Sequence, residues 1–206
     1  VAKLQKLRGI ALDGTKITDA GLKEVAKLQK LEGLILSDTK ITDAGLKEVV
    51  KLQQLTSLDL YNTKITDAGL KEIAKLQKLE LLYLSRTQIT DAGLKEVAKM
   101  NLPVRVATLG DRFGLQPKRI RIGDQRSRWG SCSSGGVLAF NWRLLLLKPN
   151  LQDYVICHEL AHLNIMDHSK NYWNFLSTLN PKATELDRQL TKLSIRLMNV
   201  GRLSKP

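Results

Sequence analysis

Residues 31–49 read LEGLILSDTKITDAGLKEV, and the chain repeats this pattern with a period of 24 residues. Four units share the pattern, and they begin at Leu7, Leu31, Leu55 and Leu79. In the fourth unit Gln88 replaces the lysine of the other three. A unit of this length cannot bury its apolar face alone, so the units are expected to stack and to share one core.

The order of residues within a unit predicts a short strand followed by a short helix. Leucines alternate with other residues at the start of the unit, and Thr42 with Asp43 can then open a helix. Thr39 stands where the usual leucine-rich repeat has an asparagine that satisfies backbone groups in the bend. The pattern is that of leucine-rich repeats. The side chains of the second unit expected to point inward are Leu31, Leu34, Leu36, Ile41, Leu46, Val49 and Leu52.

Residues between the inward leucines are expected to face outward from the concave side of the stacked strands. Down the stack these positions hold Gly9, Gly33, Ser57 and Leu81, then Ala11, Ile35, Asp59 and Tyr83, then Asp13, Ser37, Tyr61 and Ser85. Tyr61 and Tyr83 are the aromatic residues among them, and aromatic side chains often anchor protein interfaces. The concave face is therefore a candidate surface for a protein partner, the alternative being a spacer without a partner.

All three histidines of the chain lie in one run of eleven residues, His158 to His168, of the form H-E-x-x-H-x5-H. Residues four apart share one face of a helix, so His158 and His162 can direct ring nitrogens at one ion, about 2.0–2.1 Å away for zinc. Glu159 can act as general base on a water at that ion, and His168 can follow a turn as third ligand. We therefore expect the ring nitrogens to converge on a catalytic Zn²⁺ site with an open fourth position.

Cysteine content and hydropathy indicate a protein of the cytoplasm. Cys132 and Cys157 are too few for a disulfide framework, and Cys157 is expected to be a small buried residue rather than a fourth ligand. No apolar run approaches the roughly twenty residues that span a membrane. The chain begins in mid-repeat, because residues 1–7 copy residues 25–31, so the N-terminus, with any targeting signal, is expected to be missing.

The net charge of +13 is uneven along the chain. Residues 1–100 hold 17 Lys and Arg against 13 Asp and Glu, whereas residues 101–206 hold 16 against 7. A basic half can attract nucleic acid or another polyanion by releasing counterions. No basic run is interleaved with aromatic residues, so a generally basic, solvated surface is the preferred interpretation and nucleic acid remains an alternative.

The second half has its own pattern of strands and helices. Asn101-Leu102-Pro103 is expected to end the preceding helix, which places the domain boundary near residue 101. Residues 119–122 and 136–142 read as strands. We expect the second of these to be an edge strand beside the histidine helix, where an extended substrate could pair with it. Ser169 is expected to cap a further helix.

Several blocks in this half resemble those of a known family. They are Arg128-Trp129-Gly130-Ser131-Cys132, Asn141-Trp142-Arg143-Leu144, Asp153-Tyr154-Val155, residues 158–163, His168-Ser169 and Trp173. Over roughly residues 104–190 they resemble the YgjP-like metallopeptidase domain, a relative of SprT-like and WLM zinc proteases. The resemblance implies that His158, His162 and His168 ligate the metal and that Glu159 is the catalytic base. It also implies a β-rich region before the first block, where this chain has the repeats.

The sequence therefore predicts an α/β protein with a leucine-rich-repeat solenoid at residues 1–100 and a small α+β zincin-like metallopeptidase domain at residues 101–206. Such an enzyme would use zinc to hydrolyse peptide bonds of a protein or peptide substrate, with no membrane association. The developing oxyanion needs a hydrogen-bond donor. Tyr154, Tyr172, Arg128 and Asn141 are the candidate donors.

Two other functions compete with a zinc peptidase. One is a metal-dependent nucleotide pyrophosphatase, a description that some YgjP-like proteins carry, although the chain has no Gly-rich phosphate loop and no carboxylate cluster for Mg²⁺. The other is a non-catalytic adaptor in which the repeats are joined to a truncated, inert metallopeptidase remnant; the missing β-rich region favours it, whereas the intact ligand set and Glu159 count against it. Metal content and product analysis distinguish the three.

Overall fold

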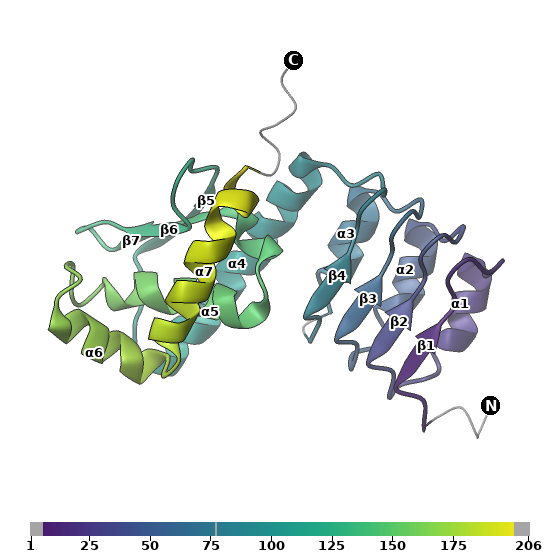
Figure 1. Ribbon diagram of the computed structural model, residues 1–206, viewed down its shortest axis with the longest axis horizontal. Coiled ribbons are helices and arrows are strands. Elements are labelled where there is room, and N and C mark those ends of the chain that lie inside the picture. The colour runs from purple at the N-terminus through teal and green to yellow at the C-terminus, as the bar shows by residue number, and fades with distance from the viewer. Residues whose placement is uncertain (1–5, 77, 200–206) are drawn as a thin grey trace, which may run out of the picture. The chain divides into compact units, whose positions relative to one another are not determined.

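The computed structural model describes residues 6–76 and 78–199, and the chain divides into two compact units, Val1–Val97 and Ala98–Pro206 (Figure 1). The first five residues, on which the predicted truncation partly rests, lie outside the described residues. Among the described residues no helix is long and apolar enough to cross a membrane. The mixed α/β organisation with a parallel sheet confirms the predicted fold class at that level.

The first unit is a stack of strand and helix pairs with one parallel sheet (Figure 1). Its strands pair in chain order, and each residue pairs with the residue 24 positions later, as Leu34 does with Leu58. The strands are β1 (Gly9–Ala11), β2 (Gly33–Ile35), β3 (Ser57–Asp59) and β4 (Leu81–Tyr83). The helices are α1 (Asp19–Val25), α2 (Asp43–Val49), α3 (Asp67–Ile73) and α4 (Asp91–Phe113), which continues into the second unit.

The core of the stack holds the side chains that the repeat pattern assigned to it. All seven inward positions named for the second unit are at most 1% exposed. Thr39 is buried, and its hydroxyl donates to the carbonyl of Leu36 at 2.6 Å. This bond gives a backbone carbonyl in the bend a hydrogen-bond partner within the same unit. The equivalent threonine of the next unit, Thr63, bonds to the carbonyl of Leu60 in the same way.

A ladder of aspartate and threonine residues joins successive units. Asp43, the first residue of α2, accepts from the backbone N–H of Thr66 at 2.9 Å and from its hydroxyl at 2.5 Å. Asp19 makes the same pair of bonds to Thr42, and Asp67 makes it to Thr90. The fit is close, because a Cβ at Gly69 would lie 2.2 Å from Oδ1 of Asp43. The recurring Thr-Asp-Ala-Gly segment therefore encodes contacts between units as well as helix starts.

The expected helix end at Asn101-Leu102-Pro103 is wrong, since α4 runs through Pro103 to Phe113. A proline inside a helix removes one backbone hydrogen bond and costs about 3 kcal/mol. Burial of apolar side chains on the same helix offsets that cost, because Ala98, Leu102 and Val106 are at most 1% exposed. Packing around the helix thus overrides the local signal of the proline.

The second unit contains a small sheet in the order β5-β7-β6, formed by β5 (Arg119–Gly123), β6 (Gly130–Cys132) and β7 (Val137–Asn141). β7 pairs with β5 in parallel and with β6 antiparallel, so the strand expected at the edge is central and that prediction is wrong. The tight turn at 133–136 folds β6 back onto β7, with Gly136 at a φ of 75°. β5 and β6 are the two edge strands, and β6 packs against α5.

Helices complete the second unit around α5 (Pro149–Ala161), which packs against β6, α6 (Lys170–Leu179) and α7 (Ala183–Met198). A 3-10 helix, η2 (Trp142–Leu146), leads from β7 into α5. Ser169 caps α6 as predicted, because its hydroxyl accepts from the backbone N–H of Tyr172. The helix α5 begins at Pro149, and proline is a favourable first helical residue.

We predict that Asp43→Ala lowers the free energy of unfolding by about 1–3 kcal/mol, because it leaves the Thr66 donors without an acceptor. Urea denaturation of the full chain measures this change. Asp91→Ala is the matched control, since Asp91 also begins a helix but no hydrogen bond is found for its side chain among the described residues. Equal losses for the two variants would contradict a stabilising ladder.

Candidate metal centre

The three histidines come together from one helix and the loop that follows it. His158 lies on α5, His162 is the residue that ends α5, and His168 lies just before α6. The Nε2 atom of His168 is 3.2 Å from Nε2 of His158 and 3.2 Å from Nε2 of His162. All three nitrogens lie within 4.8 Å of one another. The expected convergence of the rings is therefore present in the structure.

The ring of His162 is oriented by a backbone carbonyl of the turn after α5. Its Nδ1 atom lies 2.9 Å from the carbonyl oxygen of Ile165, so the proton belongs on Nδ1 and the lone pair on Nε2. This arrangement directs the electron pair at the other two rings. Ile165 had no visible role in the sequence, because a backbone carbonyl leaves no mark in the residue pattern.

Tyr172 packs against all three rings from the side of α6. Its ring stacks on His162, with centroids 4.5 Å apart and planes at 20°, and meets His158 and His168 edge to face. Its hydroxyl donates to the carbonyl of His158 at 3.1 Å, and the residue is completely buried. Tyr172 therefore holds the cluster in place, and its hydroxyl is engaged with the backbone of α5.

Burial sets the protonation of the site at neutral pH. It lowers the pKa of His158 to about 4, with a smaller lowering by the other two histidines, and it also lowers the pKa of His162. Burial likewise raises the pKa of Glu159 to about 8, against a lowering by the charge of Arg128. The imidazoles of His158 and His162 are thus neutral near pH 7, the form in which imidazole binds a metal.

The geometry and the donor set fit a metal ion with three imidazole ligands. Two nitrogens that bind one tetrahedral ion at about 2.0–2.1 Å lie roughly 3.3 Å apart, close to the two separations of 3.2 Å. The single N–H that Nε2 of His168 can carry cannot satisfy both neighbours with good hydrogen-bond geometry, whereas a cation placed among the three would. His168 is exposed, so the site has access to solvent.

Glu159 follows His158 on α5, and its side chain lies against the edge strand β6. The residue is 5% exposed, and no hydrogen bond or ion pair is found for its carboxylate within the described part of the chain. Gly130 of β6 faces it so closely that a Cβ there would lie 2.6 Å from both Cγ and Oε1 of Glu159. Sequence reasoning missed this contact, because it joins residues 29 positions apart.

Three of the four donors proposed for the oxyanion are engaged inside the protein. The hydroxyl of Tyr154 donates to Asp187 at 2.7 Å, and that of Tyr172 donates to the backbone. The amide of Asn141 donates to the carbonyls of Gln125 and Arg128. Among the four, the guanidinium of Arg128 is the donor on the surface, and its charge acts on Glu159.

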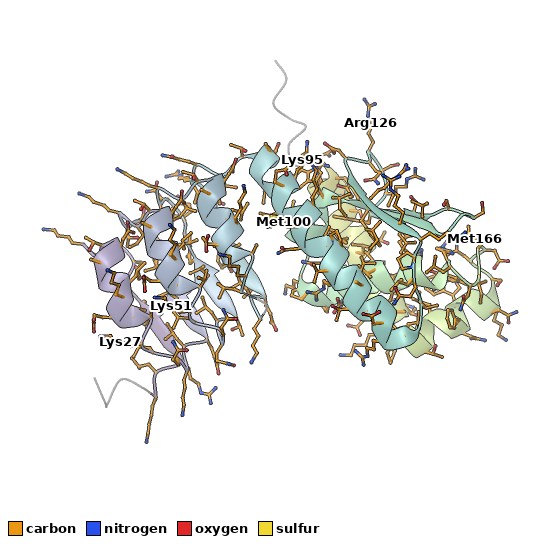
Figure 2. All side chains as sticks on the ribbon, turned by 180° about the vertical axis from the view of Figure 1, so that it is seen from behind. Lys27, Lys51, Lys95, Met100, Arg126 and Met166 are labelled. Atoms are coloured by element: carbon orange, nitrogen blue, oxygen red, sulfur yellow. The ribbon has the colours of Figure 1, made fainter. Side chains whose placement is uncertain are left out.

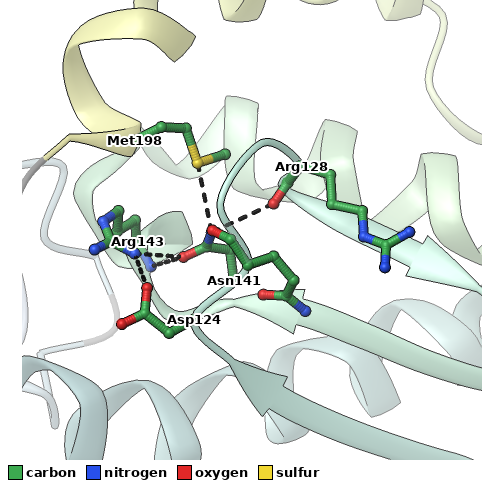
Figure 3. Close-up of polar contacts among 6 residues, drawn as sticks. Asp124, Arg128, Asn141, Arg143 and Met198 are labelled. Atoms are coloured by element: carbon green, nitrogen blue, oxygen red, sulfur yellow. Dashed lines mark hydrogen bonds and ion pairs between the residues drawn. The ribbon is translucent and has the colours of Figure 1, made fainter. Parts of the chain in front are cut away.

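A buried polar network fixes the loop that leads into β6 (Figure 3). Asn141 is fully buried, and its side-chain oxygen accepts from the backbone N–H of Arg143 at 3.1 Å. Arg143 is itself buried, forms an ion pair with Asp124 and lies over the ring of Trp142 at 4.4 Å. The guanidinium of Arg128 points away from this network in Figure 3, whereas its carbonyl accepts from Asn141.

The two cysteines take no part in the cluster of candidate ligands. Cys157 is 2% exposed, and burial raises the pKa of its thiol to about 12, which agrees with the expected packing role. Cys132 is on β6, and burial together with the charge of Glu159 raises the pKa of its thiol.

Two loops of this unit carry exposed side chains. Met166 is exposed on the loop after α5, and Arg126 is exposed on the loop before β6 (Figure 2).

Two solved structures resemble parts of the chain. The crystal structure of the metallopeptidase zymogen of Pyrococcus abyssi abylysin is 27% identical, with a TM-score of 0.40, over 45% of this chain and 94% of that one. The crystal structure of an internalin, inlF, from Listeria monocytogenes is 26% identical, with a TM-score of 0.34, over 48% of this chain and 34% of that one. No curated protein matches the chain.

The YgjP-like metallopeptidase domain matches residues 37–193, a longer segment than the residues 104–190 on which the blocks of the sequence lie. The match includes the three histidines, Glu159 and the segment from Arg128 to Cys132. Because it covers more than half of the 206 residues, the chain belongs to the YgjP-like metallopeptidase domain family.

Proposed function

We propose that the protein is a zinc-dependent peptidase in which His158, His162 and His168 hold the metal and Glu159 is the general base. A metal-dependent peptidase acting on protein or peptide substrates is what the family supports. The observation that carries the finer assignment is the convergence of three ring nitrogens beside a buried carboxylate. Three ligands with one open position are typical of a catalytic metal site.

The ligand chemistry favours zinc over magnesium and calcium. Neutral imidazole suits zinc and its neighbours in the transition series, whereas magnesium and calcium require oxygen ligands. The group of candidate ligands contains three histidines and no carboxylate. This composition also argues against a magnesium-dependent pyrophosphatase.

Catalysis would divide between the ion and the side chains around it. When bound, the ion would polarise the scissile carbonyl, lower the pKa of a nearby water and favour the ionised form of Glu159. The carboxylate of Glu159 would accept the proton of the attacking water and return it to the amine that leaves. Arg128, exposed at the rim beside Glu159, would stabilise negative charge on the substrate.

The substrate main chain would pair with the free edge of β6. This strand lies at the edge of the sheet and packs against α5, and its Gly130 contacts Glu159. An extended peptide that adds to such an edge gains backbone hydrogen bonds without a requirement for particular side chains. The role first expected for the strand at 136–142 is therefore proposed for β6.

The first unit would be a set of leucine-rich repeats that binds a protein partner or substrate through its sheet face. In support, successive strands pair at a shift of 24 residues and their leucines form the core. The outward face exposes Ile35, Leu81 and Tyr83, each at least 40% exposed, and Arg86 lies 5.5 Å from the ring of Tyr61. Exposed apolar side chains on one rigid sheet are suited to binding a protein surface.

We predict that the purified protein holds about one zinc per chain and that His162→Ala loses it, because two histidines bind zinc much more weakly than three. Metal analysis after dialysis measures the content. Asn164→Ala is the control, since Asn164 is exposed on the same loop. Zinc retained at the same content by His162→Ala would exclude His162 as a ligand.

We predict that Glu159→Gln keeps its zinc but loses about 10²–10⁴-fold in kcat on a fluorogenic peptide, because an amide cannot accept the proton. Glu185→Gln, a neutralised carboxylate on the exposed side of α7, should remain fully active. Unchanged turnover in Glu159→Gln would remove Glu159 from the mechanism.

We predict that replacing Tyr61 and Tyr83 together by alanine raises KM for casein while kcat/KM for a short peptide stays constant, because only the larger substrate would reach the sheet face of the first unit. Lys71→Ala serves as control, since Lys71 is exposed on α3 and away from the sheet. Parallel changes for both substrates would contradict a separate recognition surface.

A further inference from the structure

We propose that Gly130 is a positioning residue whose missing side chain sets the place of the Glu159 carboxylate, with Asn141 holding the backbone on which Gly130 lies. The proposal rests on the proposed function, because it gives Glu159 the role of general base. It assigns a role to the segment Arg128–Cys132, which contributes none of the candidate metal ligands.

The contact between Gly130 and Glu159 leaves no space for even a methyl group. The three atoms nearest to a Cβ at position 130 all belong to Glu159, namely Cγ at 2.6 Å, Oε1 at 2.6 Å and Cδ at 2.9 Å. Real Cβ atoms essentially never approach other heavy atoms below 3.0 Å. A side chain at position 130 therefore requires either the strand or the carboxylate to move.

The strand cannot retreat easily, because the backbone around Gly130 is held from several sides. Gly130 pairs with Phe140 of β7, and the N–H of Asn141 donates to the carbonyl of Trp129 at 2.8 Å. The side-chain amide of Asn141 donates to the carbonyl of Arg128 at 3.3 Å. Trp129 is anchored separately, since its indole N–H donates to the hydroxyl of Ser194 at 2.8 Å.

Glu159 is the more mobile partner, because no hydrogen bond or ion pair holds its carboxylate among the described residues. A rotation about its side-chain bonds would relieve the overlap at modest cost to the fold. It would also shift the carboxylate away from the place that the backbone of β6 gives it. A displacement of about 1 Å of a group that must meet a proton costs on the order of 100-fold in rate.

The test is Gly130→Ala in the full chain, with kcat and KM measured on a fluorogenic peptide and the zinc affinity measured by competition with a chelator. We expect kcat to fall about 100-fold while KM and zinc affinity stay within about twofold, since only the base has moved. The control is Gly135→Ala, where a Cβ would meet only the Ser133 hydroxyl at 3.8 Å, and it should be unaffected. Full activity of Gly130→Ala, or a loss of zinc together with activity, would overturn the proposal.

A second measurement needs no activity and tests the contact directly. The urea midpoint of the zinc-free protein is compared for Gly130→Ala, Glu159→Ala and the double variant. Gly130→Ala should lower the midpoint in the presence of Glu159 and should lower it less when Glu159 is alanine, because the overlapping atoms are gone. If Gly130→Ala fails to fold, the double variant should fold.

Equal effects of Gly130→Ala in both backgrounds, or failure of both variants to fold, would show that position 130 acts on the backbone alone and would overturn the proposal. Failure of the proposed function looks different. In that case the unmodified protein hydrolyses no peptide, whereas the urea cycle still shows whether Gly130 makes room for Glu159.

Discussion

Withdrawal of Glu159 and His162 from water is the constraint around which the second unit is organised. Both residues are less than 8% exposed, although each carries a group that prefers solvent. The surrounding elements accommodate the two buried side chains in different ways. The turn after α5 supplies the carbonyl of Ile165 for His162, and α6 supplies the ring of Tyr172 that stacks on it. The neighbouring strand β6 supplies a surface without a side chain at Gly130, so that the carboxylate fits.

The first unit meets a different constraint, because each strand and helix pair must fit a neighbour of closely similar sequence. Apolar contacts between leucines are compatible with more than one register, whereas the two hydrogen bonds that Thr66 donates to Asp43 require one register. The ladder therefore fixes how far each unit advances along the stack. One further bond between units, from the side-chain amide of Asn62 to Asp38, lies at turns where both residues have positive φ. Asparagine and aspartate tolerate that conformation better than most residues, so the same positions serve the turn and the stacking.

Features encoded by regular spacing in the sequence could be predicted, and features formed by distant pairs could not. The period of 24 residues located the buried leucines, and the helical spacing of His158 and His162 located the cluster. The order of strands in the small sheet depends on a turn and on packing, which explains why β7 was wrongly expected at the edge. The helix end expected near Pro103 was also wrong because of packing, since the burial of apolar side chains on α4 outweighs the cost of the backbone hydrogen bond that the proline removes.

The position of Gly130 connects the proposed base with the proposed substrate strand. Gly130 of β6 lies so close to Glu159 that no side chain fits between them, and the same strand is at an edge of the sheet, along which a peptide would pair. A substrate held by backbone bonds to β6 would be placed relative to Glu159 by a single short piece of backbone. Asn141 bonds to the carbonyls of Arg128 and Trp129, directly before Gly130. A shift of this segment would therefore move the substrate and the base together relative to the metal ligands. The buried network of Asn141 and Arg143 would then serve catalysis without touching the substrate, through the precision with which it holds β6 against α5.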